Sequence, residues 1–300
     1  LNVGTNRLRR DGTKIVYTPL DDNYRKALIL ANKWVKDGLL DKLAWSQNAD
    51  ALKARCMAAG ASQVAVVPGG SQGSFSTVTY TDPNARYRQF QPIKPFKGPD
   101  GKAYVPWTYD PGNVVGLIIP KKSKNPQMMV QWGDYQMSLM STLNMRLGPT
   151  FWGWAAAGEK GIDGRQAVYK VAGTPPDNAN WWEWSTYNLV MDVRHGESLN
   201  EATSIEPALY KAGKIYEPFA TPKEQFVLTP FFTSAQSNQI GELETNITNA
   251  FKQQQAAMVL GNGMDPNNDA DWQKYVSTIK AQGVDQYLDI MMKADAAQVK

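Results

Sequence analysis

The residues best suited to chemistry in this chain are its aromatic side chains. Ten tryptophans occur in 300 residues, and seven of them lie between Trp107 and Trp184. An indole ring can stack on the apolar C–H face of a pyranose, while the rim of sugar hydroxyls needs amides, carboxylates or arginines. Large aromatic side chains are also mostly buried, so we expect roughly half of the candidates to be packing residues. The candidates are Trp107, Trp152, Trp154, Trp181, Trp182 and Trp184.

A pair of carboxylates could cleave a glycosidic bond, because one can act as the acid and the other as the nucleophile or base. The spacing of the acidic residues near the tryptophans singles out no two of them, and a solvated face or a turn is their ordinary role. We therefore expect no catalytic residues and no enzyme activity. The acidic residues considered are Asp110, Asp134, Glu159, Asp163, Asp177 and Glu183.

Nucleophilic catalysis lacks its usual partners in this sequence. His195 is the only histidine, and neither a G-x-S-x-G nucleophile elbow nor a cysteine motif accompanies it. We expect His195 to lie at the surface end of a helix. Cys56 is the only cysteine, so no intrachain disulfide can form, and a plain buried or half-buried thiol is predicted.

The acidic loop from Asp265 to Asp271 has oxygen-bearing side chains at alternate positions, as a calcium loop does. It lacks the glycine at the sixth position, and Val276 stands where the bidentate glutamate belongs. Capping by Asp269 or Asp271 of a helix that begins at Trp272 explains the loop better. A histidine-rich zinc site is excluded by count, and no phosphate-binding or dinucleotide motif occurs. We expect no metal and no cofactor.

The composition is that of a globular chain, with 42% hydrophobic and 20% charged residues and a net charge of +4. The two basic clusters, 7–10 and 121–124, are too short for a nucleic-acid footprint, so nucleic acid is not expected as a partner. The longest apolar run, 114–119, is far shorter than the roughly 20 residues of a membrane-spanning helix. Residues 1–4 show neither a signal-peptide pattern nor a lipobox cysteine, so we expect that a signal was removed or that the sequence begins late.

Hydrophobic periodicity and turn residues predict a mixed α/β chain. The last part, from Trp272 to Lys300, is expected to form two short helices joined at Gly283. An Asp-Gly turn at 11–12 precedes the first strand, and a Gly/Ser loop at 69–74 follows the second. The first expected elements are a strand at 15–17 and a helix from a cap at Asp21 or Asp22 to Gly38, with one face made by Tyr24, Leu28, Ala31, Trp34 and Val35. A helix at 49–59, a strand at 63–67, a hairpin that presents Trp107 and Tyr109, and a buried strand at 114–119 follow. The remaining expectations are a helix at 127–145 capped by Asn125-Pro126, a hairpin at 161–171, little regular structure at 174–187, and helices at 199–219 and 237–260.

Two sequence patterns resemble a known family. The run from Trp272 to Ile290 reads W-x-x-Y-V-x-x-I-x-x-x-G-V-D-x-Y-L-x-I, and the run from Asn125 to Ser138 reads NPQMMVQWGDYQMS. The first is similar to the C-terminal signature of family 1 extracellular solute-binding proteins of ABC importers, in the lipoprotein or alginate-type oligosaccharide-binding branch. The second resembles the family pattern NPEAAMRWADY. The resemblance extends from about Asp11 to Lys300, and it implies the C-terminal portion of such a protein without its N-terminal segment.

The resemblance implies an α/β fold of the periplasmic-binding-protein-like type II, with two lobes, a hinge and a helix-rich C-terminal region. The first lobe is expected to be incomplete. Residues 1–109 would form part of the C-terminal lobe, 110–150 would cross over into the N-terminal lobe, and 151–300 would form a C-terminal helical region packing on the lobes and hinge.

The same resemblance supplies the expected ligand-binding residues, which are carried over from their position in the fold because no family-wide ligand motif is readable. The Gly/Ser loop would reach the ligand cleft with hydrogen-bonding groups, and the aromatic residues would line it. The expected residues are Gly70, Ser71, Gln72, Trp107, Tyr109, Asp110, Trp152, Trp154 and Trp182.

The implied function is capture of an oligosaccharide or related carbohydrate in an inter-lobe cleft, for delivery to the membrane subunits of an ABC importer. We expect a monomer located outside the cell, at the cell surface or in the periplasm, with a lipid anchor in the full-length protein. A chain that lacks one cleft wall should bind its ligand weakly or not at all. The tryptophans alone would also suit a carbohydrate-active enzyme or its accessory sugar-binding module, and a structural or peptide-binding module is a third possibility.

Overall fold

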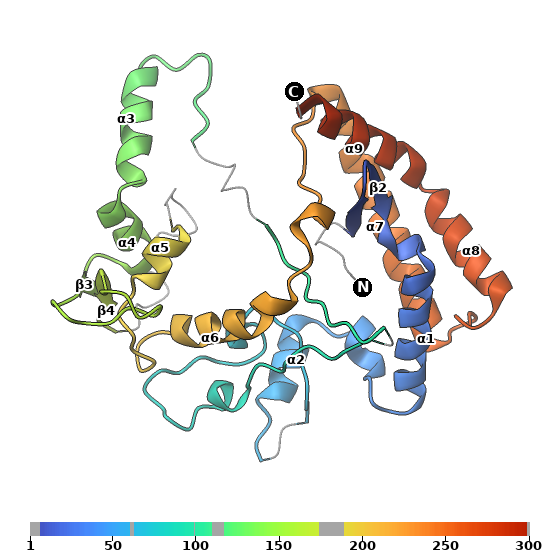
Figure 1. The fold of residues 1–300 in the computed structure, drawn as a ribbon, viewed down its shortest axis with the longest axis horizontal. Coiled ribbons are helices and arrows are strands. Elements are labelled where there is room, and N and C mark those ends of the chain that lie inside the picture. The colour runs from blue at the N-terminus through green and yellow to red at the C-terminus, as the bar shows by residue number, and fades with distance from the viewer. Residues whose placement is uncertain (1–6, 61–62, 99, 110–116, 174–188, 299–300) are drawn as a thin grey trace. The chain divides into compact units, whose positions relative to one another are not determined.

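The computed structural model describes residues 7–60, 63–98, 100–109, 117–173 and 189–298 (Figure 1). The chain forms two compact units, each assembled from segments far apart in the sequence. Unit 1 comprises Leu1–Asn48, Pro95–Tyr109 and Phe219–Lys300, and unit 2 comprises Ala49–Lys94 and Asp110–Pro218. The assignment of residue ranges to lobes remains a prediction.

Unit 1 begins with an antiparallel hairpin of β1 (Leu8–Asp11) and β2 (Lys14–Tyr17). The predicted turn lies between them, and Gly12 has a φ of +60°, a left-handed conformation that glycine adopts without steric cost. The helix α1 (Asp22–Lys36) follows, so the strand and the helix expected from the sequence are both confirmed.

One face of α1 is buried through Tyr24, Leu28, Asn32 and Val35, which recur at helical spacing. The expectation that Trp34 shares this face is wrong, because Trp34 is 44% exposed. Trp34 is next to the buried Val35 in sequence, and adjacent residues of a helix point about 100° apart around its axis.

The C-terminal helices are the ones that periodicity predicted. They are α7 (Ser234–Leu260), α8 (Asp269–Lys280) and α9 (Val284–Gln298), and Gly283, with a φ of +92°, separates the last two. Helix α7 packs on α1, α8 and α9, and α9 also packs on β2 (Figure 1). Among the described residues, the core cluster of unit 1 contains twenty buried side chains, from Leu8 in the hairpin to Met291 in α9.

The acidic loop before α8 is a capping structure. The Asn268 side chain accepts hydrogen bonds from the backbone N–H groups of Ala270 and Asp271, at 2.8 and 3.3 Å. Asp271 Oδ2 in turn accepts one from the Asp265 N–H at 2.9 Å. The expectation that Asp269 or Asp271 caps the helix is therefore wrong, because the helix begins earlier, at Asp269, and places Asn268 in the cap position.

Unit 2 consists of short elements joined by long connections. Its one apolar cluster of buried residues among those described contains Leu143, Tyr169 and Val171. Within the described residues, its helices and strands are α2 (Ala49–Cys56), α3 (Pro126–Gln136), α4 (Leu139–Leu147), β3 (Trp152–Trp154), β4 (Tyr169–Val171), α5 (Met191–His195) and α6 (Glu206–Tyr216). The 3-10 turns seen in the described part of both units are Thr18–Leu20, Lys42–Trp45, Gln72–Ser74, Arg86–Gln89, Glu217–Phe219 and Lys223–Gln225.

Two β predictions are wrong, and a third is confirmed in part. Residues 63–67 form no strand, and Val66 is 65% exposed. Among the described residues, no hairpin presents Trp107, and its segment makes an isolated parallel bridge from Val105 to Ala220. The predicted hairpin around Gly164, which has a φ of +84°, does form, through the antiparallel bridge of Lys160 with Gln166 and the hydrogen bond from the Gly161 N–H to the Arg165 carbonyl at 2.8 Å. The strand β4 that follows it pairs with β3, so the partners of β4 and of Val105 both lie outside the local sequence window in which hairpins are recognised.

The helix expected over 127–145 is two helices. Helix α3 ends at Gln136, and the Ser138 side chain caps α4 by accepting a hydrogen bond from the Ser141 N–H at 3.3 Å. The apolar spacing continues across this break, so periodicity alone does not reveal it. The helices expected at 49–59 and 199–219 are confirmed but shorter, and Cys56 is fully buried. Residues 114–116 and 174–187 lie outside the described residues.

None of the helices in the described part of the chain is both long and apolar enough to cross a membrane.

A buried amide joins α1 to the C-terminal end of α7 in unit 1. Asn32 of α1 donates from Nδ2 to the carbonyl oxygens of Met258 and Val259, both at 3.1 Å. These carbonyls belong to the last turn of α7, where no intrahelical donor remains.

We therefore expect Asn32→Ala to lower the free energy of unfolding by about 1–3 kcal/mol, because two buried carbonyl groups lose their donor. Urea denaturation followed by circular dichroism measures the change. Asn23→Ala is the matched control, since Asn23 is exposed on the same helix, and its cost should stay within about 0.5 kcal/mol. Equal costs for the two substitutions would contradict this role of Asn32.

Candidate functional site

A pocket of about 270 Å³ lies within unit 2, between α6 and the loop 72–92. We call it the α6 pocket. Helix α6 provides one side and the loop the other, so residues more than a hundred positions apart meet here. The lining residues are Gln72, Tyr87, Arg88, Phe90, Gln91, Pro92, Glu201, Ser204, Ile205, Ala208, Lys211 and Ile215.

The helical side of the α6 pocket is mainly apolar. Ala208, Lys211 and Ile215 recur at spacings of three and four, which places them on one face of α6. Tyr87 and Phe90 face them from the loop. Aromatic and aliphatic walls with a few polar groups are the usual lining of a small-molecule site.

The loop side of the pocket is held by Arg88. Its guanidinium donates to the carbonyl oxygens of Tyr80 at 3.3 Å, Asp82 at 3.3 Å and Glu201 at 3.0 Å. The same group lies over the Tyr87 ring, 4.9 Å from the centroid. Three backbone acceptors and a cation–π contact fix this side chain, so the wall is preformed.

Polar groups at the pocket can bind hydroxyls. Glu201 and Lys211 form an ion pair at the rim, and their side chains are 50% and 65% exposed. Gln72 is partly exposed, and its carbonyl accepts from the Ser76 hydroxyl at 2.6 Å. The Tyr87 hydroxyl is buried and, among the described residues, has no hydrogen-bond partner. A ring with apolar faces and a polar rim matches this set of groups.

The glycine- and serine-rich loop is more structured than the sequence suggests. Residues 72–74 form a 3-10 turn, and Ser71 and Ser74 cap it reciprocally through their side chains and backbone N–H groups. Gly70 is exposed, with nothing near the position of an added Cβ. Of the three loop residues expected to bind ligand, Gln72 is the one that lines the α6 pocket.

The structure places Trp152 and Trp154 together on β3. Their rings meet edge to face, with centroids 5.0 Å apart. Trp152 packs against the cluster of unit 2, and its indole N–H donates to Asn144 Oδ1 at 2.9 Å. Trp154 is 54% exposed and leaves its ring accessible. Trp152 therefore has a packing role, and Trp154 is the one of the pair with a free ring.

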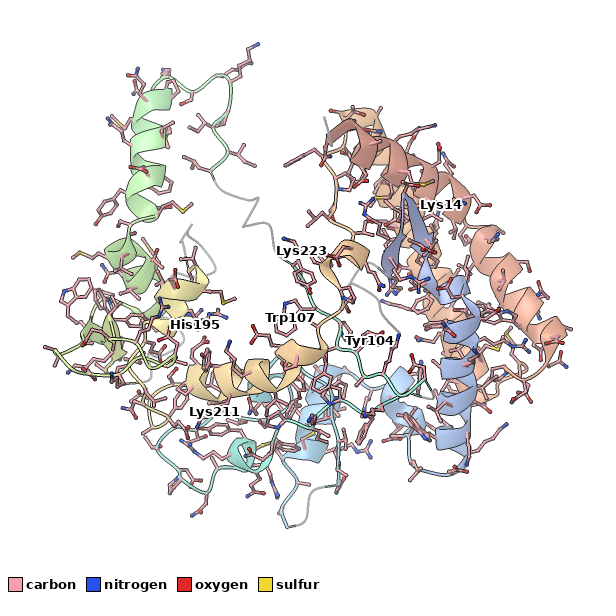
Figure 2. All side chains as sticks on the ribbon, in the orientation of Figure 1. Lys14, Tyr104, Trp107, His195, Lys211 and Lys223 are labelled. Atoms are coloured by element: carbon pink, nitrogen blue, oxygen red, sulfur yellow. The ribbon has the colours of Figure 1, made fainter. Side chains whose placement is uncertain are left out.

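Trp107 and Tyr109 lie in unit 1, both partly exposed; Figure 2 labels Trp107 in its extended segment. The Tyr109 hydroxyl donates to the Thr221 carbonyl at 2.5 Å, and its ring packs edge-on against Phe226, 5.8 Å away. Phe226 lines another pocket of about 480 Å³, whose wall includes the Arg10–Asp295 ion pair. The remaining two expected site residues, Asp110 and Trp182, lie outside the described residues.

Beside the α6 pocket lies a buried acidic cluster that the sequence analysis missed. Glu206, at the start of α6, pairs with Arg146 at 2.8 Å and with Arg194 at 3.6 Å. Glu197 is 3% exposed and accepts a hydrogen bond from the Tyr169 hydroxyl at 3.4 Å. Ser204, which lines the pocket, also hydrogen-bonds Glu197.

Burial raises the pKa of Glu197 to about 7, and the nearby Glu206 carboxylate adds to the shift, while the hydrogen bond from Ser204 and the charge of Arg146 oppose it. The group is thus protonated in the folded protein over a pH range where it would be ionised in the unfolded chain.

Two of the candidate carboxylates, Glu159 and Asp163, are engaged in structural contacts, while Asp110, Asp177 and Glu183 lie outside the described residues. Glu159 accepts from the Ser198 hydroxyl at 2.6 Å and from the Ala156 N–H at 2.8 Å. Asp163 pairs with Arg165 at 2.6 Å. His195 ends α5 as expected (Figure 2). Its ring meets that of Tyr210 in α6, with the ring centroids 4.9 Å apart. Within the described ranges, no group of three or more metal-binding side chains occurs.

The ionisation of Glu197 leads to a pH prediction. Between about pH 4.5 and 7 the unfolded state has released this proton and the folded state has not, so stability falls as pH rises through this window. Glu197→Gln should remove that loss and make the protein more stable than the unaltered chain at pH 8, by about 3 kcal/mol. Urea midpoints measured from pH 5 to 8 test this, with exposed Glu242→Gln as the control. A Glu197→Gln profile parallel to that of the unaltered chain would contradict the prediction.

Comparison with known proteins identifies the fold. No family model and no curated protein matches the sequence. Solved structures do match. An extracellular solute-binding protein from Bifidobacterium longum subsp. infantis aligns with a TM-score of 0.66 at 16% identity, over 98% of this chain and 58% of that chain. The ABC-transporter substrate binding protein FusA of S. pneumoniae, in complex with kestose, aligns with a TM-score of 0.62 at 16% identity, over 99% of this chain and 58% of that chain.

A third match is the alginate-binding protein AlgQ2 without calcium ion, with a TM-score of 0.59 at 16% identity, over 96% of this chain and 57% of that chain. These matched structures are a substrate-binding, a solute-binding and an alginate-binding protein. The chain therefore has the fold of periplasmic-binding-protein-like type II proteins, as predicted, and it spans 58% of the length of the first matched structures.

Proposed function

We propose that this protein is the solute-binding component of an ABC importer and captures an oligosaccharide on the outer side of the membrane. The observation that carries the proposal is the fold match, which extends over nearly the whole chain. The matched proteins are described as bound to kestose, as HMO binding and as alginate-binding. A monomer that delivers its ligand to importer membrane subunits, with or without a lipid anchor, is part of the same proposal.

The α6 pocket supports a carbohydrate ligand on chemical grounds. A sugar ring placed there would lay its C–H face on Phe90 and on the aliphatic side chains of α6. Its hydroxyls would reach Gln72 and the Glu201–Lys211 pair at the rim. These rim groups retain their solvent exposure in the absence of ligand, so replacing water by sugar hydroxyls costs little.

The exposed Trp154 ring is a second element of the proposed binding surface. Its face is free for stacking, and the perpendicular Trp152 ring fixes its orientation. Stacking on a fixed ring avoids the entropy cost of ordering a mobile side chain.

Binding to the α6 pocket can be tested with two lysines on the same helix. Lys211→Ala should weaken the Kd for an oligosaccharide by about tenfold, because a charged donor to hydroxyls is lost. Lys214→Ala is the matched control: Lys214 is exposed, pairs with Glu217 and does not line the pocket. Isothermal titration with kestose, milk oligosaccharides and alginate oligosaccharides measures both variants.

The titration is made on the 300-residue chain and on the same protein extended upstream to its natural start. Saccharide binding by the extended form alone agrees with the expectation that one cleft wall is missing here. Equal Kd values for the two lysine variants would remove the α6 pocket from the proposal. No binding of any saccharide by either form would contradict the function itself.

A further inference from the structure

A second pocket lies wholly within unit 1, beside the β1–β2 turn. Its volume is about 480 Å³, against about 270 Å³ for the α6 pocket. Three separate segments form it: the turn at 10–12, the residues 223–228 and the end of α9. We call it the 223–228 pocket. The lining residues are Arg10, Asp11, Gly12, Lys223, Glu224, Gln225, Phe226, Leu228 and Asp295.

The apolar part of the 223–228 pocket is made by Phe226 and Leu228, both of which are partly open to solvent. The Phe226 ring is held by the ring of Tyr109, whose hydroxyl donates to the Thr221 carbonyl. Thr221 in turn donates from its N–H and its hydroxyl to the Val105 carbonyl, at 3.1 and 3.0 Å. A ring fixed by this chain of contacts offers an apolar surface without the entropy cost of ordering it.

Charged side chains surround this apolar surface. The Arg10 guanidinium pairs with Asp295 at 2.7 Å, and their side chains are 26% and 22% exposed. Asp11, Lys223 and Glu224 are exposed, and none of these three side chains pairs with another described residue. Lys223 is labelled in Figure 2. Two carboxylates and an ammonium group are therefore available to a ligand.

This combination of groups suits a sugar. The C–H face of a pyranose packs on aromatic and aliphatic carbon, and its hydroxyls pair with carboxylate and guanidinium groups. Phe226 and Leu228 supply the carbon surface of the pocket. Asp11 and Glu224 supply acceptors for hydroxyl hydrogens, and Lys223 supplies a donor.

The charges of the pocket favour an uncharged sugar over an acidic one. The Arg10 charge is already balanced by Asp295, with which it forms an ion pair. For an incoming ligand, the carboxylates of Asp11 and Glu224 therefore outweigh the ammonium group of Lys223. The carboxylate of a uronate would meet net repulsion here, whereas the hydroxyls of a neutral sugar would find charged acceptors.

We infer that the 223–228 pocket is a second binding site of this protein and takes the end of an uncharged oligosaccharide. It lies in a different unit from the α6 pocket and shares no lining residue with it. The inference rests on the proposed function only for the class of ligand, so the two sites can be tested separately.

Methyl nuclear magnetic resonance resolves the two sites in one titration. Leu228 reports on the 223–228 pocket, and Ile215 reports on the α6 pocket. Maltotriose, an uncharged trisaccharide, should shift the Leu228 methyl signals, and the acidic trigalacturonate should give a Kd about tenfold weaker there, because its carboxylates are repelled. A shift at Leu228 without one at Ile215 would support this site and contradict binding at the α6 pocket. Leu228 signals that no saccharide moves would overturn the inference, whatever happens at Ile215.

The double variant Asp11→Asn and Glu224→Gln tests the role of charge. It leaves Lys223 as the unbalanced charge of the pocket, so trigalacturonate should now bind at Leu228 at least as tightly as maltotriose. Both substituted residues are exposed, so the Tm should change little. Asp22→Asn and Glu242→Gln form the control, since they remove the same total charge from exposed positions of unit 1 outside the pocket. A preference for maltotriose that survives in the pocket variant would contradict the inference.

A basic peptide is the other ligand that the two available carboxylates would suit. The tripeptide Lys-Gly-Lys should bind at Leu228 no more tightly than maltotriose, because it has no apolar ring face to lay on Phe226 and Leu228. A tighter Kd for this peptide would assign the 223–228 pocket to a basic peptide and overturn the inference.

Discussion

The constraint on which unit 2 depends is the charge network at the start of α6. Its apolar cluster has three buried side chains among the described residues, against twenty in unit 1. Helices α4, α5 and α6 are joined instead by Glu206, which receives Arg146 from one helix and Arg194 from the next. Partly buried ion pairs fix geometry more reliably than they add stability, since desolvation offsets much of the attraction. This arrangement also positions the α6 pocket, because the residues that line the pocket belong to α6, to the residues just before it and to the loop 72–92.

Unit 1 could be predicted largely from its sequence, and the reason is local. The apolar residues of α1, α7, α8 and α9 recur at helical spacing, and Gly12 and Gly283 mark turns that need a left-handed backbone. Each of these signals lies within a few residues of the element it defines. The exception is also local: α8 begins three residues before Trp272, the residue from which the helix was expected to start, so Asn268 and not a later aspartate is its cap.

The β elements and the site could be predicted only in part, because their partners are distant. Strand β4 pairs with β3, and Val105 bridges to Ala220, across separations that no hairpin pattern encodes. Of the expected binding residues, Gln72 lines the α6 pocket and Trp154 keeps an exposed ring, while Trp152 is used for packing. Lys211, Tyr87 and Phe90, which line the α6 pocket, were not among the expected residues. The available signal was the pair Tyr87 and Phe90, two aromatic residues three positions apart in a polar, proline-rich stretch. The sequence does not show that they pack opposite α6, which is more than a hundred residues further along the chain.

The tie between Asn32 and the end of α7 has a consequence for biosynthesis. Its two partners lie 226 and 227 residues further along the chain, and Arg10 finds Asp295 after 285 residues. A ribosome therefore releases the hairpin and α1 well before the helices that cover them exist, so the apolar face of α1 stays open until α7 has been made. Contacts of such long sequence separation slow folding, because loop closure precedes the gain from packing. The core of unit 1 therefore cannot close until the helices α7 to α9 have been synthesised.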